Sequence, residues 1–269
     1  MCCVTSGPGS TNTITGVAGS WIESLPMLII SGQVKRKDMV GKRRIRQGGV
    51  QEVEILPVIK NLTKYAETIT SLQNLDRNLI KAFNNFNPHV ALDFHEYRPF
   101  RKDFAQLSSF GISNPYDVMF LYTGNLNVPE NIRTIIDTLF VKNAKIPLDE
   151  LNLRHRHYMK SEKYKGEIHF STGTNTARSS SNFYALNNTI ATLFEIRGVG
   201  IGKTSFKRRI NSGLAVGFSF LKTAYENSTF IFNQIDIANT YTNDIVLQHE
   251  RSIYTDVIKA IDMESNELI

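Results

Sequence analysis

The sequence predicts an α/β fold in two parts, residues 1–70 and residues 71–269. In the first part, short apolar runs alternate with glycine turns and helical patterns, the order found in a parallel α/β sheet. In the second part the rhythm changes, and two apolar strands are separated by about a hundred residues. Hydrophobic residues make up 41% of the chain and charged residues 21%, a balance typical of globular domains.

The elements of the first part follow one another closely. Residues 2–5 predict a short buried strand that runs directly into a glycine turn. Residues 9–21 predict a helix whose small residues allow close packing. Residues 26–31 contain Met27-Leu28-Ile29-Ile30, a continuous apolar run typical of a parallel strand covered on both faces. A second helical pattern covers residues 51–59.

The second part begins with an amphipathic helix over residues 75–86, which Asn87-Pro88 ends. Two strands are predicted, residues 90–95 with His95 at the end and residues 190–196 with Glu195 near the end. Three further expectations concern the rest: a polar, loop-rich stretch over 98–165 with a helix near 129–140, a long helix over 203–225, and small strands over 229–247.

Most of the net charge of +6 lies in one basic stretch, residues 35–46. A nucleic-acid patch is one interpretation of such a stretch. A solvated loop is the favoured one, because no aromatic residue is interleaved with the charges to stack on bases. We therefore expect no nucleic-acid partner.

Composition also bears on the compartment. No run of 18 apolar residues occurs, so no membrane span or membrane partner is expected. The amino-terminal residues lack the pattern of a secretory signal. The only cysteines, Cys2 and Cys3, are neighbours and would point to opposite faces of a strand, which makes them poor disulfide partners. A reducing, cytoplasmic location is the expectation.

The segment Thr5-Ser6-Gly7-Pro8-Gly9-Ser10-Thr11-Asn12, followed by Pro26-Met27-Leu28-Ile29-Ile30-Ser31-Gly32-Gln33 and by Gly48-Gly49-Val50-Gln51-Glu52, carries a specific resemblance. It resembles the pyrimidine-binding domain of thiamine-diphosphate enzymes of the acetolactate synthase type, over about residues 2–70. The resemblance implies thiamine diphosphate with magnesium as cofactor and a small 2-oxo acid as substrate. It also implies that Pro8 and Asn12 lie near the aminopyrimidine and Gln51 near the substrate channel. A glycine turn lets backbone approach a flat heterocycle closely.

Two departures from this family are expected to leave the thiamine site incomplete. Family members activate the cofactor with a glutamate that precedes the glycine turn, and only residues 1–4 precede it here. They also hold magnesium and diphosphate through a Gly-Asp-Gly segment, which this sequence does not contain.

In the second part, residues 91–97 and 193–198 each place a titratable side chain at the end of an apolar strand. Ligands of open α/β sheets bind outside the carboxyl ends of strands. A neutral imidazole there suits zinc, and a nearby carboxylate suits a general base that deprotonates zinc-bound water.

These two segments resemble the C-terminal portion of zinc carboxypeptidases, over about residues 75–225. The resemblance implies a peptide substrate and a zinc ion, with His95 as the third zinc ligand and Glu195 as general base and acid. It further implies Tyr184 as the aromatic residue of the substrate loop. The family's first two ligands come from a His-x-x-Glu segment, yet none of the six histidines here has a glutamate three residues on. The zinc site is therefore expected to be incomplete.

Three functions stay open: an inactive metallocarboxypeptidase-like hydrolase, a thiamine-diphosphate-dependent carboligase or decarboxylase, and a non-enzymatic product in which two incomplete domains are fused. An oligomer is compatible with each.

Two smaller sequence signals each allow two interpretations. His155 and His157 fit a metal pair on a strand or, preferably, a solvated basic loop. The glycines of residues 198–204 fail as a phosphate loop, because Arg197 stands at the first glycine position.

Overall fold

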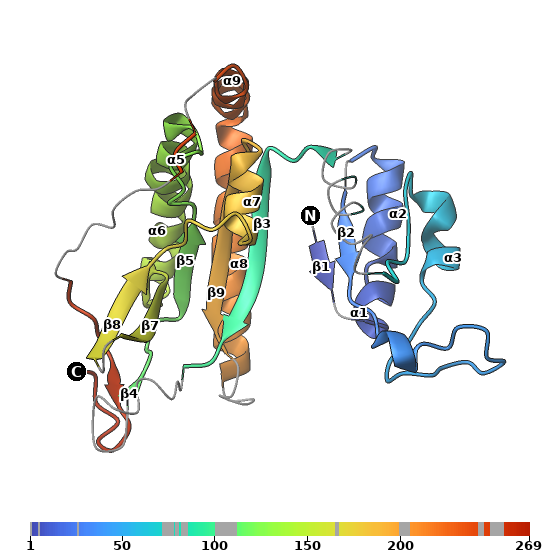
Figure 1. The fold of residues 1–269 in the computed structure, drawn as a ribbon, viewed down its shortest axis with the longest axis horizontal. Helices are drawn as coiled ribbons and strands as arrows, with labels where there is room; N and C mark the ends of the chain where they lie inside the picture. The colour runs from blue at the N-terminus through green and yellow to red at the C-terminus, as the bar shows by residue number, and fades with distance from the viewer. Residues whose placement is uncertain are drawn as a thin grey trace. The chain divides into compact units, whose positions relative to one another are not determined.

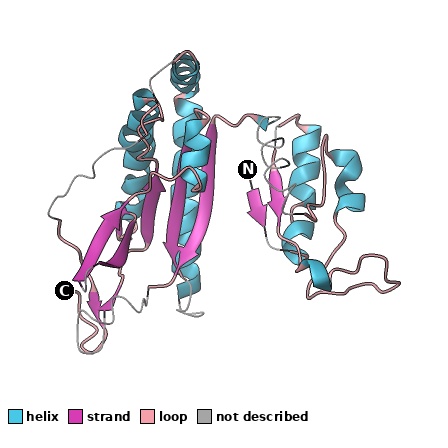
Figure 2. Ribbon diagram, in the orientation of Figure 1, coloured by secondary structure: helices cyan, strands magenta, loops and turns pink. Residues whose placement is uncertain are grey.

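The computed structural model describes residues 2–4, 6–25, 27–71, 78, 81, 86–99, 112–164, 167–198, 205–241, 245–247 and 256–269. The chain divides into two compact units, Met1–Pro88 and His89–Ile269, and their elements are labelled in Figure 1. This division falls after residue 70, where the two sequence resemblances were expected to meet. Both units are mixed α/β structures (Figure 2).

In the first unit, strands β1 (Cys2–Val4) and β2 (Ile29–Ser31) pair in parallel. This unit also contains the short helix α3 (Leu56–Ile59) and the 3-10 turns η1 (Arg36–Asp38) and η2 (Lys60–Leu62). The strand predicted over 26–31 is confirmed at its end only. Its side chains are half-buried, so the two covered faces typical of such an apolar run are not formed within the described residues.

The helix expected over residues 9–21 is in fact two helices, α1 (Pro8–Thr11) and α2 (Ile14–Ile22). The Thr13 hydroxyl donates to the Ser10 carbonyl oxygen at 2.7 Å, and a side chain that bonds nearby backbone competes with helix continuation. The second predicted helix, over 51–59, is also shorter than expected and forms only at α3.

The second unit is built on a four-stranded sheet in the order β3-β9-β5-β6. Its strands are β3 (Val90–Tyr97), β9 (Ile190–Arg197), β5 (Val118–Tyr122) and β6 (His155–His157). The first two confirm the strands predicted over 90–95 and 190–196. They run parallel to each other, while β5 runs antiparallel to β9 and parallel to β6.

The expectation of a loop-rich stretch over residues 98–165 is wrong. Its middle contains β5, whose residues Val118 to Phe120 are almost fully buried. Because β5 is covered on both faces, it is a continuous apolar run that lacks the alternation of a half-exposed strand. A helical stretch follows, made of α5 (Glu130–Ile135), the π-helical turn η4 (Ile136–Val141) and α6 (Lys142–Glu150). Residues 155–157, which were expected in a basic loop, form strand β6.

Three helices lie in the later part of the chain: α7 (Ser180–Leu186) before β9, and α8 (Phe206–Glu226) and α9 (Ser228–Asn239) after it. The long helix expected over 203–225 is confirmed from residue 206 onward. The small strands expected over 229–247 are wrong where the structure describes this segment. Ile231, Ile235 and Ala238 are buried at helical spacing, which favours α9. The helix predicted over 75–86 lies largely outside the described residues.

Helices cover both faces of the sheet, with α8 on one face and α7 on the other (Figure 1). Even-numbered residues of β9, such as Phe194 and Ile196, join Phe120 and Phe220 in the main core. Odd-numbered residues therefore face α7. The hairpin β7 (Met159–Tyr164) and β8 (Glu167–Thr172) and the antiparallel pair β4 (Ile112–Ser113) and β10 (Ile261–Asp262) extend the unit.

No helix in the described part of the chain is both long and apolar enough to span a bilayer.

Candidate functional site

The candidate site lies at the carboxyl ends of β3 and β9, on the sheet face that carries α7. The parallel register pairs His95 with Glu195. Side chains two residues apart share a face, so Asp93 and Arg197 lie on this face as well. The sequence prediction that His95 and Glu195 lie close together is confirmed by this register. Their roles as zinc ligand and general base stay predictions.

A hydrogen-bonded chain of three side chains forms the centre of the site. The Asp93 carboxylate contacts His95 Nε2 through Oδ1 at 3.2 Å and accepts a hydrogen bond from the Ser180 hydroxyl through Oδ2 at 2.6 Å. Asp93 is 17% exposed, whereas His95 is 50% exposed. The carboxylate is therefore held from two sides, while the imidazole stays open to solvent and to a ligand.

The ionisation of both groups reflects this contact. The hydrogen bond to Asp93 raises the pKa of His95, and the nearby Asp93 and Glu195 charges act in the same direction against partial burial. Burial opposes ionisation of Asp93, yet the hydrogen bonds from His95 and Ser180 outweigh it and lower the pKa of that carboxyl. The pair therefore favours an imidazolium beside a carboxylate.

A second network lies beyond Glu195, where β3 and β9 end. Arg197 Nε donates to the Asn114 carbonyl oxygen at 2.8 Å, and burial lowers the pKa of Arg197. The Tyr97 hydroxyl donates to Asn114 Oδ1 at 3.1 Å, and burial raises the pKa of Tyr97 strongly. Arg208 of α8 contacts the nearly buried Asp117 at 2.7 Å. This network anchors the segment around Asn114 against the ends of both strands.

Sequence reasoning missed Asp93 and Ser180. Asp93 could have been found, because it stands two residues before His95 on a predicted strand and so shares its face. Ser180 could not, because only the packing of α7 on the sheet brings it to Asp93 across 87 residues of sequence.

Tyr184 is one turn beyond Ser180 on α7, and its carbonyl oxygen accepts a hydrogen bond from the Thr189 amide, just before β9 begins. Its role as the aromatic residue of a substrate loop stays a prediction.

In the first unit, the structure brings the glycine turn and the Gln51 segment together. Gly7 has a φ of +61°, and a Cβ added there would lie 1.9 Å from the Gln51 carbonyl oxygen. Gln51 itself has a φ of +61° and is exposed. Pro8 and Asn12 are exposed at the two ends of α1. Two segments that the sequence resemblance named separately thus form one surface.

The described residues do not fit a catalytic zinc ion. They contain no group of three or more His, Cys, Asp or Glu side chains able to hold a metal. A catalytic zinc site needs three protein ligands and an open position. His155 and His157 do not supply them, because His155 Nε2 contacts Asp149 at 2.8 Å while His157 lies beside Tyr122 at 3.4 Å.

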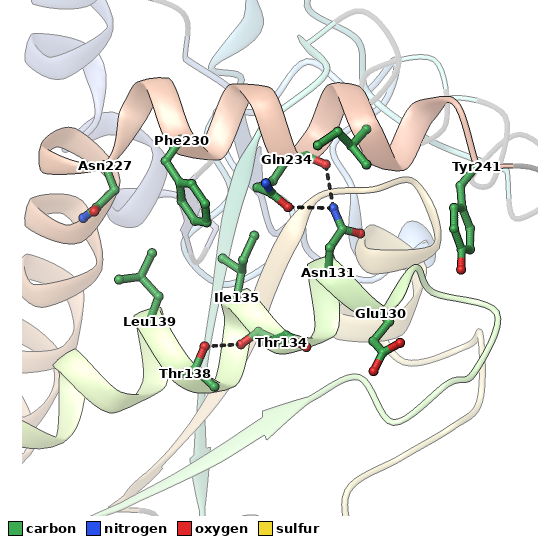
Figure 3. A pocket seen from close by; sticks show the side chains of 11 residues that line it. Glu130, Asn131, Thr134, Ile135, Thr138, Leu139, Asn227, Phe230, Gln234 and Tyr241 are labelled. Carbon is green, nitrogen blue, oxygen red and sulfur yellow. Dashed lines mark hydrogen bonds between the residues drawn. The ribbon is translucent and has the colours of Figure 1, made fainter.

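A further hollow of the second unit lies away from these strand ends. A groove of about 820 Å³ runs between α5–η4 and α9 (Figure 3). Asn131 Nδ2 bridges it to Gln234, donating to the backbone oxygen at 2.8 Å and to Oε1 at 3.1 Å. Ile135 and Phe230 also line the groove. Its titratable side chains are Glu130 and Tyr241. This composition suits packing and offers no catalytic pair.

Comparisons with known proteins match the two parts of the chain separately. Residues 1–58 match the family model described as thiamine pyrophosphate enzyme, N-terminal TPP binding domain. The large subunit of acetolactate synthase isozyme 2 from Escherichia coli is 37% identical over 84 residues, which is 31% of this chain and 14% of that protein. Chloroplastic acetolactate synthase from Arabidopsis thaliana is 34% identical over 83 residues, 31% of this chain and 12% of that protein.

The rest of the chain matches a different group of proteins. Carboxypeptidase 2 of Trichophyton rubrum is 30% identical over 187 residues, 66% of this chain and 33% of that protein. Carboxypeptidase 2 of Trichophyton tonsurans is 31% identical over 180 residues, 64% of this chain and 32% of that protein. The chain resembles two protein families, one in each part. It spans about a third of the length of these carboxypeptidases.

Proposed function

We propose that residues 89–269 form a carboxypeptidase-type unit that binds peptides at the paired ends of β3 and β9 and does not hydrolyse them by itself. The observation that carries this proposal is the register of His95 against Glu195. The similarity to carboxypeptidase 2 supplies the substrate class.

The donor set supports binding without hydrolysis. The described residues contain no group of three His, Cys, Asp or Glu side chains able to hold a metal, whereas a catalytic zinc needs three protein ligands. The imidazole of His95 is also engaged by Asp93 through Nε2. A catalytic zinc would lower the pKa of its bound water to about 7, which is the activation that the role of Glu195 in a zinc peptidase would depend on.

The experiment combines a binding assay and a hydrolysis assay on the full chain. A fluorescently labelled peptide is titrated with the protein, and release of its C-terminal residue is followed with and without added zinc. We expect saturable binding that His95→Ala weakens, and no zinc-dependent release. His157→Ala is the matched control, because it removes a histidine from strand β6 while leaving the His95 pair intact.

Two results would overturn this proposal. Absence of binding, or binding that His95→Ala and His157→Ala affect equally, would remove the site from the ends of β3 and β9. Zinc-dependent release of the terminal residue, lost in both His95→Ala and Glu195→Gln, would show a complete hydrolytic site instead.

A second candidate function rests on the contact between Gly7 and Gln51. This surface is the counterpart, by family similarity, of the pyrimidine side of a thiamine-diphosphate site. Pro8, Asn12 and Gln51 carry no charge, so they offer a diphosphate no cationic partner and magnesium no carboxylate. We therefore propose that this surface takes at most the pyrimidine and binds thiamine diphosphate weakly. Calorimetry with thiamine diphosphate and magnesium tests this, and micromolar affinity would contradict it.

A further inference from the structure

The solvent-facing side of α8 carries a continuous apolar stripe. Its members recur every three or four residues and are between 43% and 85% exposed: Phe206, Ile210, Leu214, Phe218, Leu221 and Tyr225. This spacing places them on one side of the helix over about 30 Å. Exposed apolar patches of this extent mark interaction surfaces in soluble proteins. We call these six residues the α8 stripe.

Strand β3 ends the sheet beside this stripe. Among the described strands, β3 pairs with β9 on one side and has no strand on the other. Its Phe94 is 46% exposed and faces Gly217 of α8, where an added Cβ would lie 3.6 Å from the phenyl ring. A free strand edge presents unpaired amide and carbonyl groups that can pair with another strand. The edge and the stripe therefore adjoin on one side of the unit.

We propose that this side is an interface between two copies of the chain, related by a two-fold axis perpendicular to the sheet. In this arrangement β3 pairs antiparallel with β3 of the partner subunit, and α8 packs antiparallel against α8 of the partner subunit. An isologous interface of this kind requires a surface that is complementary to itself.

The α8 stripe has this self-complementarity. Read about its midpoint, it pairs Phe206 with Tyr225, Ile210 with Leu221, and Leu214 with Phe218. Each pairing joins two large apolar side chains. The charges at the helix ends are mixed, because Lys207 would meet Glu226 of the partner subunit while Arg209 would meet Lys222 of the partner subunit, so the apolar pairing carries the argument.

The register of β3 supports the same axis. With Phe94 on the two-fold axis, Phe94 meets Phe94 of the partner subunit on the α8 side. On the other face, Asp93 lies opposite His95 of the partner subunit. Opposite charges directly across an antiparallel pair stabilise it.

The spacing of helices and strands also agrees. Neighbouring strands lie about 4.8 Å apart, so the axis lies about 2.4 Å beyond β3. Helix α8 packs on both β3 and β9, which places it about 5 Å from the axis. Its copy then lies about 10 Å away, at the upper end of the usual distance between packed helices.

Sedimentation of the full chain over a concentration series tests the interface. We expect a dimer that Leu214→Glu and Phe218→Glu each weaken at least about tenfold, because each would place a charge in an apolar contact. Ile146→Glu is the matched control, since it changes an equally exposed apolar residue on α6 and should leave the dimer intact. Circular dichroism checks that every variant is folded.

Cross-linking tests the register independently of stability. In a background without Cys2 and Cys3, Phe94→Cys should form an intersubunit disulfide when diamide is added as the oxidant. Glu96→Cys should not, because its two copies would lie about 13 Å apart along the strands. A chain that stays monomeric, a dimer that the stripe variants leave unchanged, or cross-linking at residue 96 instead of 94 would each overturn the proposal.

Discussion

His95 and Glu195 occupy the same register position on two parallel strands, although a hundred residues separate them in sequence. The pairing of β3 with β9 alone creates this juxtaposition. Asp93 then fixes His95 from the same face, and Ser180 fixes Asp93 from α7. The candidate site is thus a property of two strand ends and one packed helix.

The first prediction concerns the His95–Asp93 pair. Asp93→Asn should lower the pKa of His95, because the hydrogen bond and charge of Asp93 raise it. A raised pKa means that the imidazolium stabilises the fold at pH values below about 6.5, and that this contribution is lost as the pH rises through the raised value. Proton NMR titration of the His95 ring measures the shift. An unchanged pKa in Asp93→Asn would contradict the contact.

The second prediction concerns the loop that Glu52 holds. Its carboxylate accepts hydrogen bonds from the Val40 amide at 2.7 Å and the Gly48 amide at 2.9 Å, and the bond from Val40 is the main cause that lowers its pKa. The loop should stay ordered above the ordinary pKa of 4.5 and loosen as the pH falls through the lowered value.

Hydrogen exchange of the Val40 and Gly48 amides tests this prediction at neutral pH. Glu52→Gln should accelerate exchange at both amides, because a neutral side chain accepts these hydrogen bonds less strongly. Glu54→Gln, which changes an exposed neighbour, is the control and should have no effect. Equal exchange in the two variants would assign the order of the loop to other contacts.

The third prediction concerns the centre of the core. Phe194 is fully buried and its ring lies 5.0 Å from that of Phe220 and 5.8 Å from that of Phe120, centroid to centroid. Phe194→Ala should lower the free energy of unfolding by about 3–5 kcal/mol, because it removes apolar contacts and leaves a cavity. Urea unfolding of the full chain measures this. Ile146→Ala on the surface should change it by less than about 0.5 kcal/mol.

The fourth prediction concerns Gly7. Its φ of +61° and the 1.9 Å approach of the Gln51 carbonyl oxygen leave no room for a side chain. An alanine in the left-handed conformation costs about 1–2 kcal/mol. Gly7→Ala should lower the stability of the first unit by more than this amount, because the Gln51 backbone must also move to make room for the Cβ. Gly16→Ala is the control, since nothing lies within 4 Å of the added Cβ on α2. In limited proteolysis of the full chain, Gly7→Ala should be cleaved within residues 1–88 faster than the unmodified protein, whereas Gly16→Ala should be cleaved at the same rate as the unmodified protein.

The sequence by itself determined the elements whose patterns are local. The apolar runs at 90–95 and 190–196 predicted β3 and β9, because a strand buried on both faces is apolar throughout. The helical spacing beyond residue 203 predicted α8, because burial of one helix face leaves a period of 3.6 residues. The motifs around Gly7 and Glu195 were sufficient to indicate both family resemblances, which the comparisons confirm.

Only the tertiary structure decided which of these elements meet. The order β3-β9-β5-β6 places β5 in the middle of the sheet, where a stretch expected to be loop is fully buried. The packing of α7 brings Ser180 to Asp93, and the fold of the first unit brings the backbone of Gln51 against Gly7. Such long-range contacts depend on how whole elements share one core, and the residues involved carry no local pattern that reveals it.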